Sequence, residues 1–99
     1  MVDYYILDDK RAVKCDLMVW AKWMESGVDR HVADTTKNGV RISTVFLGLD
    51  HNYFSGNNDN PLIFETMAFN AKGDDIFCER CSTWEQAEAQ HEKICKQVA

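Results

Sequence analysis

Val40-Arg-Ile-Ser-Thr-Val-Phe-Leu-Gly-Leu-Asp-His51 is the stretch that decides the fold of this 99-residue chain. Successive residues of a strand point to opposite sides, so this stretch predicts a strand with two different faces. One face consists of Val40, Ile42, Thr44 and Phe46. The other face begins polar and becomes apolar at Val45, Leu47 and Leu49. We therefore expect residues 40–49 to form a strand that is covered on both faces near its end.

Turn signals on both sides of this stretch predict four consecutive strands. Asn38-Gly39 suits the positive backbone dihedrals of a two-residue hairpin turn. After a polar loop at residues 51–60, the apolar chain returns, and Lys72-Gly73-Asp74 turns it once more. The strands expected from these signals span residues 32–37, 40–49, 62–70 and 76–79.

The beginning of the chain predicts a hairpin followed by a helix. Residues 2–14 form two short strands around a polar turn at residues 8–10. Asp16 is a suitable helix N-cap, because its carboxylate can accept a hydrogen bond from an otherwise unpaired backbone N–H. The inward stripe of this helix is Leu17, Trp20, Trp23 and Met24. We expect the helix to end at Ser26-Gly27.

A second helix is expected near the end of the chain. Ser82-Thr-Trp-Glu85 has the spacing of a capping box, in which Ser82 and Glu85 each satisfy a backbone donor near the other. The inward stripe of this helix is Trp84, Ala87, His91, Ile94 or Cys95, and Val98. The resulting order is strand–strand–helix–four strands–helix (ββαββββα). It predicts one α+β domain over residues 1–99, with a mainly antiparallel sheet of about five to six strands and two helices on one face.

Composition limits the classes of function. The formal net charge of −5 argues against non-specific binding to DNA or RNA, which depends on basic side chains that neutralise phosphates. No apolar run approaches the roughly 18 residues of a membrane span, and no charged-then-apolar leader opens the chain. We expect a soluble cytoplasmic protein with no membrane contact, in which the four cysteines stay reduced. The acidic residues are scattered, which indicates a solvated surface rather than a mimic of nucleic acid.

Several of these segments also carry a resemblance. Ser43-Thr-Val-Phe-Leu-Gly-Leu-Asp-His51, Pro61-Leu-Ile-Phe-Glu-Thr-Met67 and the capped helix with His91 resemble a family of small proteins encoded in bacteriophage and prophage genomes. The resemblance extends from the Trp20 helix to the last helix. It implies a phage or prophage origin and a bacterial cytoplasm as the setting, and it implies no activity. Small phage proteins of this size frequently bind and modulate a host protein, including components of antiviral defence.

One candidate metal site lies near the end of the chain. Cys78-x-x-Cys81 followed by His91-x-x-x-Cys95 could supply three thiolates and one imidazole to a structural zinc ion. The nine-residue gap between the two pairs is shorter than the usual finger spacing, and the cysteines are not part of the family pattern. We favour the alternative of small buried thiols and a hydrogen-bonded core histidine. A redox role for the two nearby cysteines is a further alternative, and it requires the first cysteine to lie at a helix N-terminus.

A candidate catalytic group consists of Asp50, His51, Glu65 and His91. Carboxylates and imidazoles that meet near one loop could support proton transfer or hydrolysis. No nucleophile motif or phosphate-binding glycine loop accompanies them, and a carboxylate bound to a histidine is more often a structural contact. Glu65 could instead face Arg41 or Arg80 across the sheet.

The polar loop at residues 51–60 is the candidate partner-binding site. Tyr53 and Phe54 are adjacent aromatic residues there, next to His51, and neither obeys a helical or strand period. Exposed aromatic side chains on a loop held by strands are typical anchors for a partner. The alternative is that Phe54 folds back against the sheet.

These observations favour a non-enzymatic protein that binds a host or phage protein as an inhibitor or modulator. The alternatives are a small zinc-binding module, a hydrolase and a protein that sequesters a small ligand. We expect no cofactor other than the zinc ion just considered. The sequence does not decide the oligomeric state.

Overall fold

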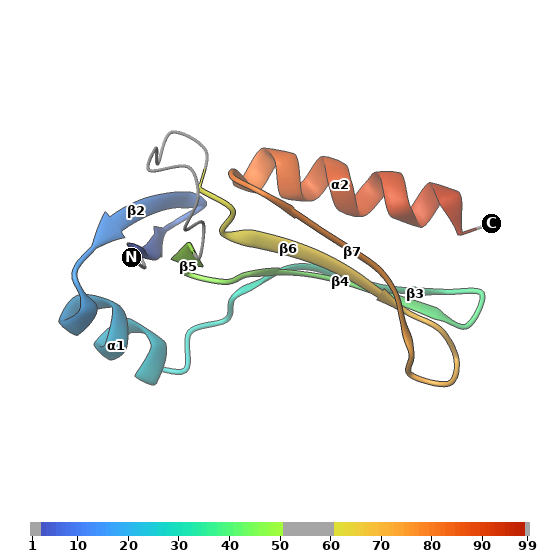
Figure 1. Ribbon diagram of the computed structural model, residues 1–99, viewed down its shortest axis with the longest axis horizontal. Coiled ribbons are helices and arrows are strands. Elements are labelled where there is room, and N and C mark those ends of the chain that lie inside the picture. Colours follow the sequence, from blue (N-terminus) through green and yellow to red (C-terminus); the bar gives the residue numbers. More distant parts are fainter. Residues whose placement is uncertain (1–2, 51–60, 99) are drawn as a thin grey trace.

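The computed structural model describes residues 3–50 and 61–98 and contains seven strands and two helices in these ranges (Figure 1). In chain order they are β1 (Asp3–Asp8), β2 (Arg11–Cys15), α1 (Leu17–Glu25), β3 (His31–Lys37), β4 (Val40–Phe46), β5 (Leu49–Asp50), β6 (Phe64–Phe69), β7 (Asp75–Cys81) and α2 (Trp84–Gln97). Every strand pairing is antiparallel. The α+β class expected from the sequence is thereby confirmed.

The strands form two sheets rather than one. The larger sheet has the order β3-β4-β6-β7, and the smaller has the order β2-β1-β5. The strand expected over residues 40–49 divides, because β4 ends at Phe46 and β5 pairs with β1 instead. Gly48 lies between them with a φ of 77°, a backbone conformation that turns the chain out of the larger sheet and favours glycine.

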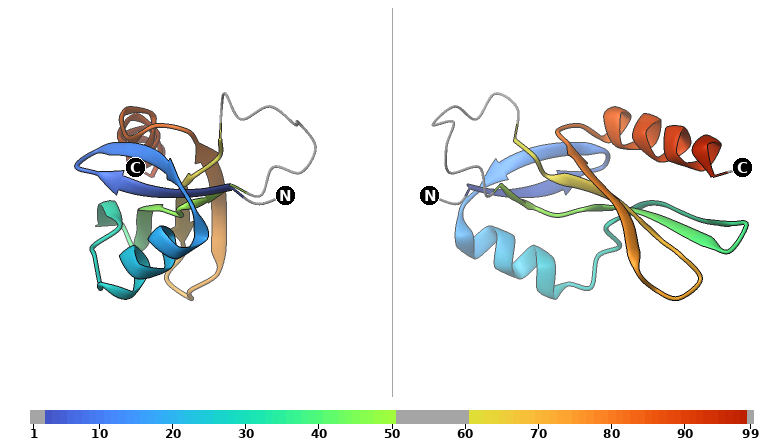
Figure 2. Two further views of the ribbon diagram at one scale, coloured as in Figure 1. Left: turned by 90° about the vertical axis from the view of Figure 1, so that its left-hand side faces the viewer. Right: turned by 45° about the vertical axis from the view of Figure 1, so that its right-hand side comes forward.

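Each helix covers a different sheet. α2 packs against all four strands of the larger sheet, and α1 lies against β1 of the smaller one. Figures 1 and 2 show the two helices on opposite sides of the molecule. This differs from the expected arrangement of both helices on one face, because the break at Gly48 gives α1 a sheet of its own. The rings of Tyr4 and Trp20, 5.3 Å apart, join β1 to α1.

A row of aromatic rings runs through the core from one helix to the other. Trp23 of α1 meets Phe46 edge-on at 5.7 Å between centroids, and Phe46 lies 5.1 Å from Phe64. Phe64 in turn meets Trp84 of α2 at 6.3 Å. Phe46 and Phe64 are both fully buried. The apolar end of β4 therefore serves as the centre of the core, as its sequence predicts.

Three local predictions are confirmed: the Asn38-Gly39 turn, the N-cap of α1 and the end of α1. Asn38 and Gly39 have φ values of 53° and 79° between β3 and β4. The backbone N–H of Val19 donates to Asp16 at 2.9 Å, and α1 has Ser26 as its C-cap.

The capping box of α2 lies one residue later than the sequence pattern indicated. Thr83 is the N-cap, its hydroxyl accepts from the backbone N–H of Gln86, and the Gln86 side chain accepts from the backbone N–H of Thr83. Ser82 and Glu85 do not form the expected box. A Ser-Thr pair allows either frame, and the antiparallel pairing of Cys81 with Phe64 holds the strand end so that the helix starts at Trp84.

Candidate functional site

The larger sheet has one face covered by α2 and one outer face. Residues that oppose each other in an antiparallel pair point to the same side. Thr44 opposes Thr66, and both are fully buried beneath α2. Glu65 opposes Arg80, and Met67 opposes Cys78, which places these four side chains on the outer face. The predicted metal-ligating and catalytic residues therefore divide between the two faces of this sheet.

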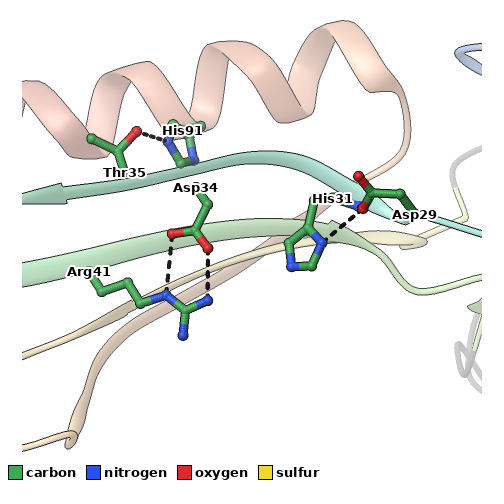
Figure 3. Close-up of polar contacts among 6 residues, drawn as sticks. All are labelled: Asp29, His31, Asp34, Thr35, Arg41 and His91. Atoms are coloured by element: carbon green, nitrogen blue, oxygen red, sulfur yellow. Dashed lines mark hydrogen bonds and ion pairs between the residues drawn. The ribbon is translucent and has the colours of Figure 1, made fainter.

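His91 connects α2 to the covered face. Its Nε2 lies 2.9 Å from the hydroxyl of Thr35 (Figure 3). Its Nδ1 lies 2.7 Å from the hydroxyl of Thr44. Thr44 also meets the hydroxyl of Thr66 at 2.8 Å. His91 is 6% exposed. One residue of α2 thereby binds β3 and β4 directly and reaches β6 through Thr44.

The surroundings of His91 favour its neutral form. Burial lowers the pKa of His91, while the carboxylate of Asp34 opposes that effect weakly. A neutral imidazole has one N–H donor and one acceptor nitrogen, and the two hydroxyls can satisfy both. The histidine therefore acts as a structural tie, which is the alternative that the sequence favoured over a metal ligand.

The predicted zinc ligands are not brought together. Cys78 lies on the outer face, where its thiol is 3.6 Å from Glu65, whereas His91 lies on the covered face. Cys81 packs beside the core, and Cys95 packs beside Ile94. Within residues 3–50 and 61–98, no three His, Cys, Asp or Glu side chains lie close enough together to hold a metal ion. All four cysteines of the chain are unpaired.

The two cysteines of the Cys-x-x-Cys pattern also lack the setting of a redox pair. Three residues apart in β7, they point to opposite faces of the sheet. Partial burial and Glu65 raise the pKa of the Cys78 thiol, and burial raises the pKa of the Cys81 thiol. Both thiols are therefore held in the protonated form, which is a poor nucleophile.

The three described members of the predicted catalytic group, Asp50, Glu65 and His91, lie apart from one another. Glu65 lies on the outer face and accepts a hydrogen bond from Arg80 at 2.9 Å, the cross-strand contact that the sequence allowed. His91 lies on the covered face, and Asp50 is buried in β5 of the smaller sheet. His51 falls outside the described residues. The arrangement brings no carboxylate and imidazole of this group into contact among the residues described.

The predicted partner-binding residues His51, Tyr53 and Phe54 also lie outside the described residues. Their role stays a prediction from the sequence.

Ion pairs occupy the outer face near β3. Arg41 donates to both oxygens of Asp34, at 3.2 and 2.7 Å, and His31 meets Asp29 at 2.9 Å (Figure 3). The hydrogen bond from Arg41 lowers the pKa of Asp34, and the backbone hydrogen bond from His31 lowers the pKa of Asp29. Asp34 is neutralised by Arg41 and Asp29 is hydrogen-bonded to His31, so these groups do not point to a ligand.

The most informative hollow lies between β7 and α2, and we name it the β7–α2 groove. Residues 79–82 form one wall, and Leu62 also lines the groove. The helix wall consists of Gln86, Ala89, Gln90 and Lys93, whose spacing places them on one side of α2. The groove has a volume of about 500 Å³ and is open to solvent.

Gln90 is the unusual residue of the groove. Its side chain is 8% exposed, and its amide oxygen is buried without a hydrogen-bond partner among the described residues. A buried acceptor without a partner costs about 1–3 kcal/mol. Because this oxygen is itself buried, a ligand in the groove does not reach it in this conformation.

Sequence reasoning missed Gln90, although a signal was available. Ala87, Gln90, His91 and Ile94 are the buried residues of α2. Their spacing is that of one helical face. The same spacing therefore predicts that Gln90 is buried and that its side-chain amide needs hydrogen-bond partners. The predicted inward stripe included Ala87, His91 and Ile94 but omitted Gln90 between them.

A second hollow of about 410 Å³ lies between the β1–β2 turn and the start of α2. Asp8, Asp9 and Glu85 line it together with Lys10 and Arg11. Because these charges have both signs, the hollow favours no particular ligand.

Apolar side chains are exposed at the first turn of α1. Leu17, Met18 and Val19 are 50%, 65% and 44% exposed, and α1 buries no residue fully.

Neither helix of the described chain is long and apolar enough to cross a membrane.

Comparisons with protein-family models, with curated proteins and with solved structures found no match to this chain.

Proposed function

We propose that this protein acts by non-enzymatic binding to a host or phage protein, as an inhibitor or modulator, and that the β7–α2 groove is its binding site. One observation carries the proposal: an open groove of about 500 Å³ lies beside β7, the edge strand of the sheet with the order β3-β4-β6-β7. Edge strands and the grooves beside them are common places for protein recognition.

Charge and setting agree with this function. The net charge of −5 disfavours nucleic acid as the partner and favours a protein. The resemblance of residues 43–51 and 61–67 to phage-encoded proteins favours a bacterial cytoplasm as the place where the partner is met. A modulator needs only to occupy its target, so a groove without catalytic groups is sufficient.

The test is capture of proteins from a bacterial lysate on the immobilised full chain, compared across four variants. Ala89→Arg fills the groove, whereas Gln97→Arg adds the same charge to α2 beyond the groove lining given above. Lys22→Glu on α1 is matched to Lys93→Glu in the groove. We expect Ala89→Arg and Lys93→Glu to lose at least 10-fold of the captured partner, while the two controls keep it. Equal capture by all four variants would reject the groove as the site.

Sequestration of a small ligand is the second candidate, because the groove volume lies within the range of ligand pockets, roughly 300–1,000 Å³. Native mass spectrometry of the protein purified from a bacterial cytoplasm distinguishes it. A stoichiometric organic adduct that is absent from Ala89→Arg would favour sequestration. A mass equal to that of the bare chain would favour the protein partner.

A further inference from the structure

Among the described residues, the core beneath α2 consists of two separate apolar clusters. The first joins the start of α2 to α1 and the smaller sheet, and Phe46 and Ala87 are among its buried residues. The buried residues of the second are Ile42, Ala68 and Ile94. Because Ile94 lies seven residues after Ala87, the two halves of α2 pack against different clusters.

Polar side chains lie between these clusters, and we name them the polar layer. The polar layer consists of Thr35, Thr44, Thr66, Gln90 and His91. Along β4, Thr44 lies two residues from Phe46 of the first cluster and two residues from Ile42 of the second. The hydrogen bonds of His91 therefore fill the place where the apolar packing under α2 is interrupted.

The polar layer favours His91 in its neutral form. A neutral imidazole has one acceptor nitrogen, so either Thr35 or Thr44 donates its hydroxyl proton to the ring. Protonation converts this acceptor into a donor, and the hydroxyl must then turn its proton elsewhere. The imidazolium is also a buried charge, which is costly unless it is paired.

None of the charged side chains on the elements around His91 contacts its ring in the described structure. The covered faces of β4 and β6 carry no charged residue. On the same side of the sheet, β7 presents Glu79, which opposes Thr66, and β3 presents the cation of Lys37. Asp34 acts on the pKa of His91 from the outer face, against the larger effect of burial.

The neighbours of His91 on α2 itself do not supply a counter-ion contact either. Glu88 lies about one turn before His91 and is exposed, and Cys95 lies about one turn after it. Glu92 pairs with Lys96 at 3.2 Å. A proton on His91 would therefore be a buried charge without a contacting partner among the described residues.

We propose that the part of α2 from His91 to Gln97 opens away from the larger sheet when the imidazole takes up a proton, while the start of α2 stays in place. The start is held by the first cluster and by its capping box. The later part is held by Ile94 in the second cluster and by the bond from Lys37 to the carbonyl of Cys95 at 3.1 Å. Opening brings the imidazolium into water, and loss of the proton reverses it.

This opening changes the β7–α2 groove. Lys93 belongs to the part that opens, whereas Gln86 and Ala89 belong to the part that stays. The groove therefore loses one end of its helix wall in mildly acidic solution. The inference does not depend on the proposed function, since the opening is measured on the chain without a partner.

Two free cysteines report on the two parts separately. Cys95 packs against the second cluster and Cys81 packs against the first, and both are only partly exposed. Each is labelled with a pyridyl disulfide reagent and followed by mass spectrometry of the peptides that contain it. The rate for each thiol is divided by its rate in the urea-unfolded chain at the same pH, which gives its relative accessibility.

We expect the relative accessibility of Cys95 to rise by about 3- to 10-fold between pH 7.5 and 5.5, because a histidine with an unfolded pKa of about 6.5 allows at most about a 10-fold change over this interval. The accessibility of Cys81 should change by less than about 2-fold over the same interval. Equal rises at both cysteines would show opening of the whole molecule and would overturn the inference. A constant accessibility of Cys95 would overturn it as well.

His91→Gln removes the titration and keeps a side chain that can donate and accept. We expect the accessibility of Cys95 in this variant to be independent of pH. His31→Gln is the matched control, because His31 has a side chain that is 54% exposed, and it should keep the rise of the parent chain. A rise at Cys95 that persists in His91→Gln would overturn the assignment to His91. Should His91→Gln have no thermal unfolding transition, the comparison of Cys95 with Cys81 in the parent chain still decides.

Discussion

Gly48 fixes the direction of the chain where it leaves the larger sheet. A Cβ atom at this position would lie 2.9 Å from Trp20 Nε1 and 3.1 Å from the carbonyl oxygen of Tyr5. The backbone N–H of Tyr5 also donates to the carbonyl of Gly48 at 2.9 Å. The close approach of β1 and α1 thus depends on a residue without a side chain.

Gly48→Ala is expected to lower the free energy of unfolding by about 2–4 kcal/mol, from left-handed backbone strain together with steric overlap. Gly73→Ala is the matched control, because Gly73 has a similar φ of 87° but nothing within 4 Å of its Cβ position. The control should lose only about 1 kcal/mol. Urea unfolding measures both variants, and equal losses would contradict the close packing around Gly48.

Thr44→Val tests the hydroxyl that connects His91 to Thr66. Valine keeps the shape of threonine but leaves a buried nitrogen of His91 without its partner. We expect a loss of about 1–3 kcal/mol in the free energy of unfolding. Thr36→Val, an exposed position in β3, should change stability by less than about 0.5 kcal/mol. A small effect at Thr44 would show that the network contributes little.

The lowered pKa of His91 predicts a dependence of stability on pH. Burial disfavours the protonated form in the folded state, so the unfolded chain binds more protons near and below a pH of about 6.5. The contribution of His91 is therefore fully present above that pH and decreases as the pH falls toward the folded pKa. Urea unfolding between pH 7.5 and 5 should show a decrease that is smaller in His91→Gln. An equal decrease in both proteins would refute this assignment.

At the scale of elements, two adjacent pairs of residues could form the capping box at the start of α2. The sequence allowed Ser82 and Glu85 as a capping box, and the structure uses Thr83 and Gln86 instead. Serine and threonine cap helices almost equally well, so local chemistry cannot choose between adjacent frames. The position of Cys81 in β7, set by its pairing with β6, makes the choice.

Thr83→Ala is expected to destabilise the protein by about 1 kcal/mol, because it removes the side-chain acceptor for the Gln86 N–H. Ser82→Ala removes the same kind of hydroxyl one residue earlier and should cost less than about 0.5 kcal/mol. Thermal unfolding followed by far-UV circular dichroism compares the two. A larger effect at Ser82 would favour the frame that the sequence pattern indicated.

At the scale of the whole molecule, the two faces of the larger sheet determine which residues meet. Cys78 and Glu65 lie on the outer face, and His91 projects from α2 onto the covered face. Spacing along the chain suggested that these groups could share a site. The alternation of side chains in β6 and β7 separates them instead.

Metal removal is expected to leave the fold unchanged, because Cys78 and His91 cannot reach one ion. The thermal midpoint of the purified protein should shift by less than about 1 °C when a strong zinc chelator is added, since a structural zinc site contributes directly to folding. Cys78→Ser should behave as the parent chain does. A large decrease on chelation would restore the zinc hypothesis.

The sequence by itself determined the features that depend on neighbouring residues. Asn38-Gly39 set the β3–β4 turn, Asp16 capped α1, and alternation in residues 40–46 gave β4 its buried face. Each of these follows from the conformational preference of one or two residues or from a short period. The α+β class followed from their order along the chain.

Only the tertiary structure decided how these elements were shared between two sheets. Gly48 permits a turn, but the close packing of Trp20 and Tyr5 against it makes β5 pair with β1. In the same way, the β7–α2 groove exists only because α2 lies beside β7. These contacts join residues far apart along the chain, and their energies depend on distances that no local pattern specifies.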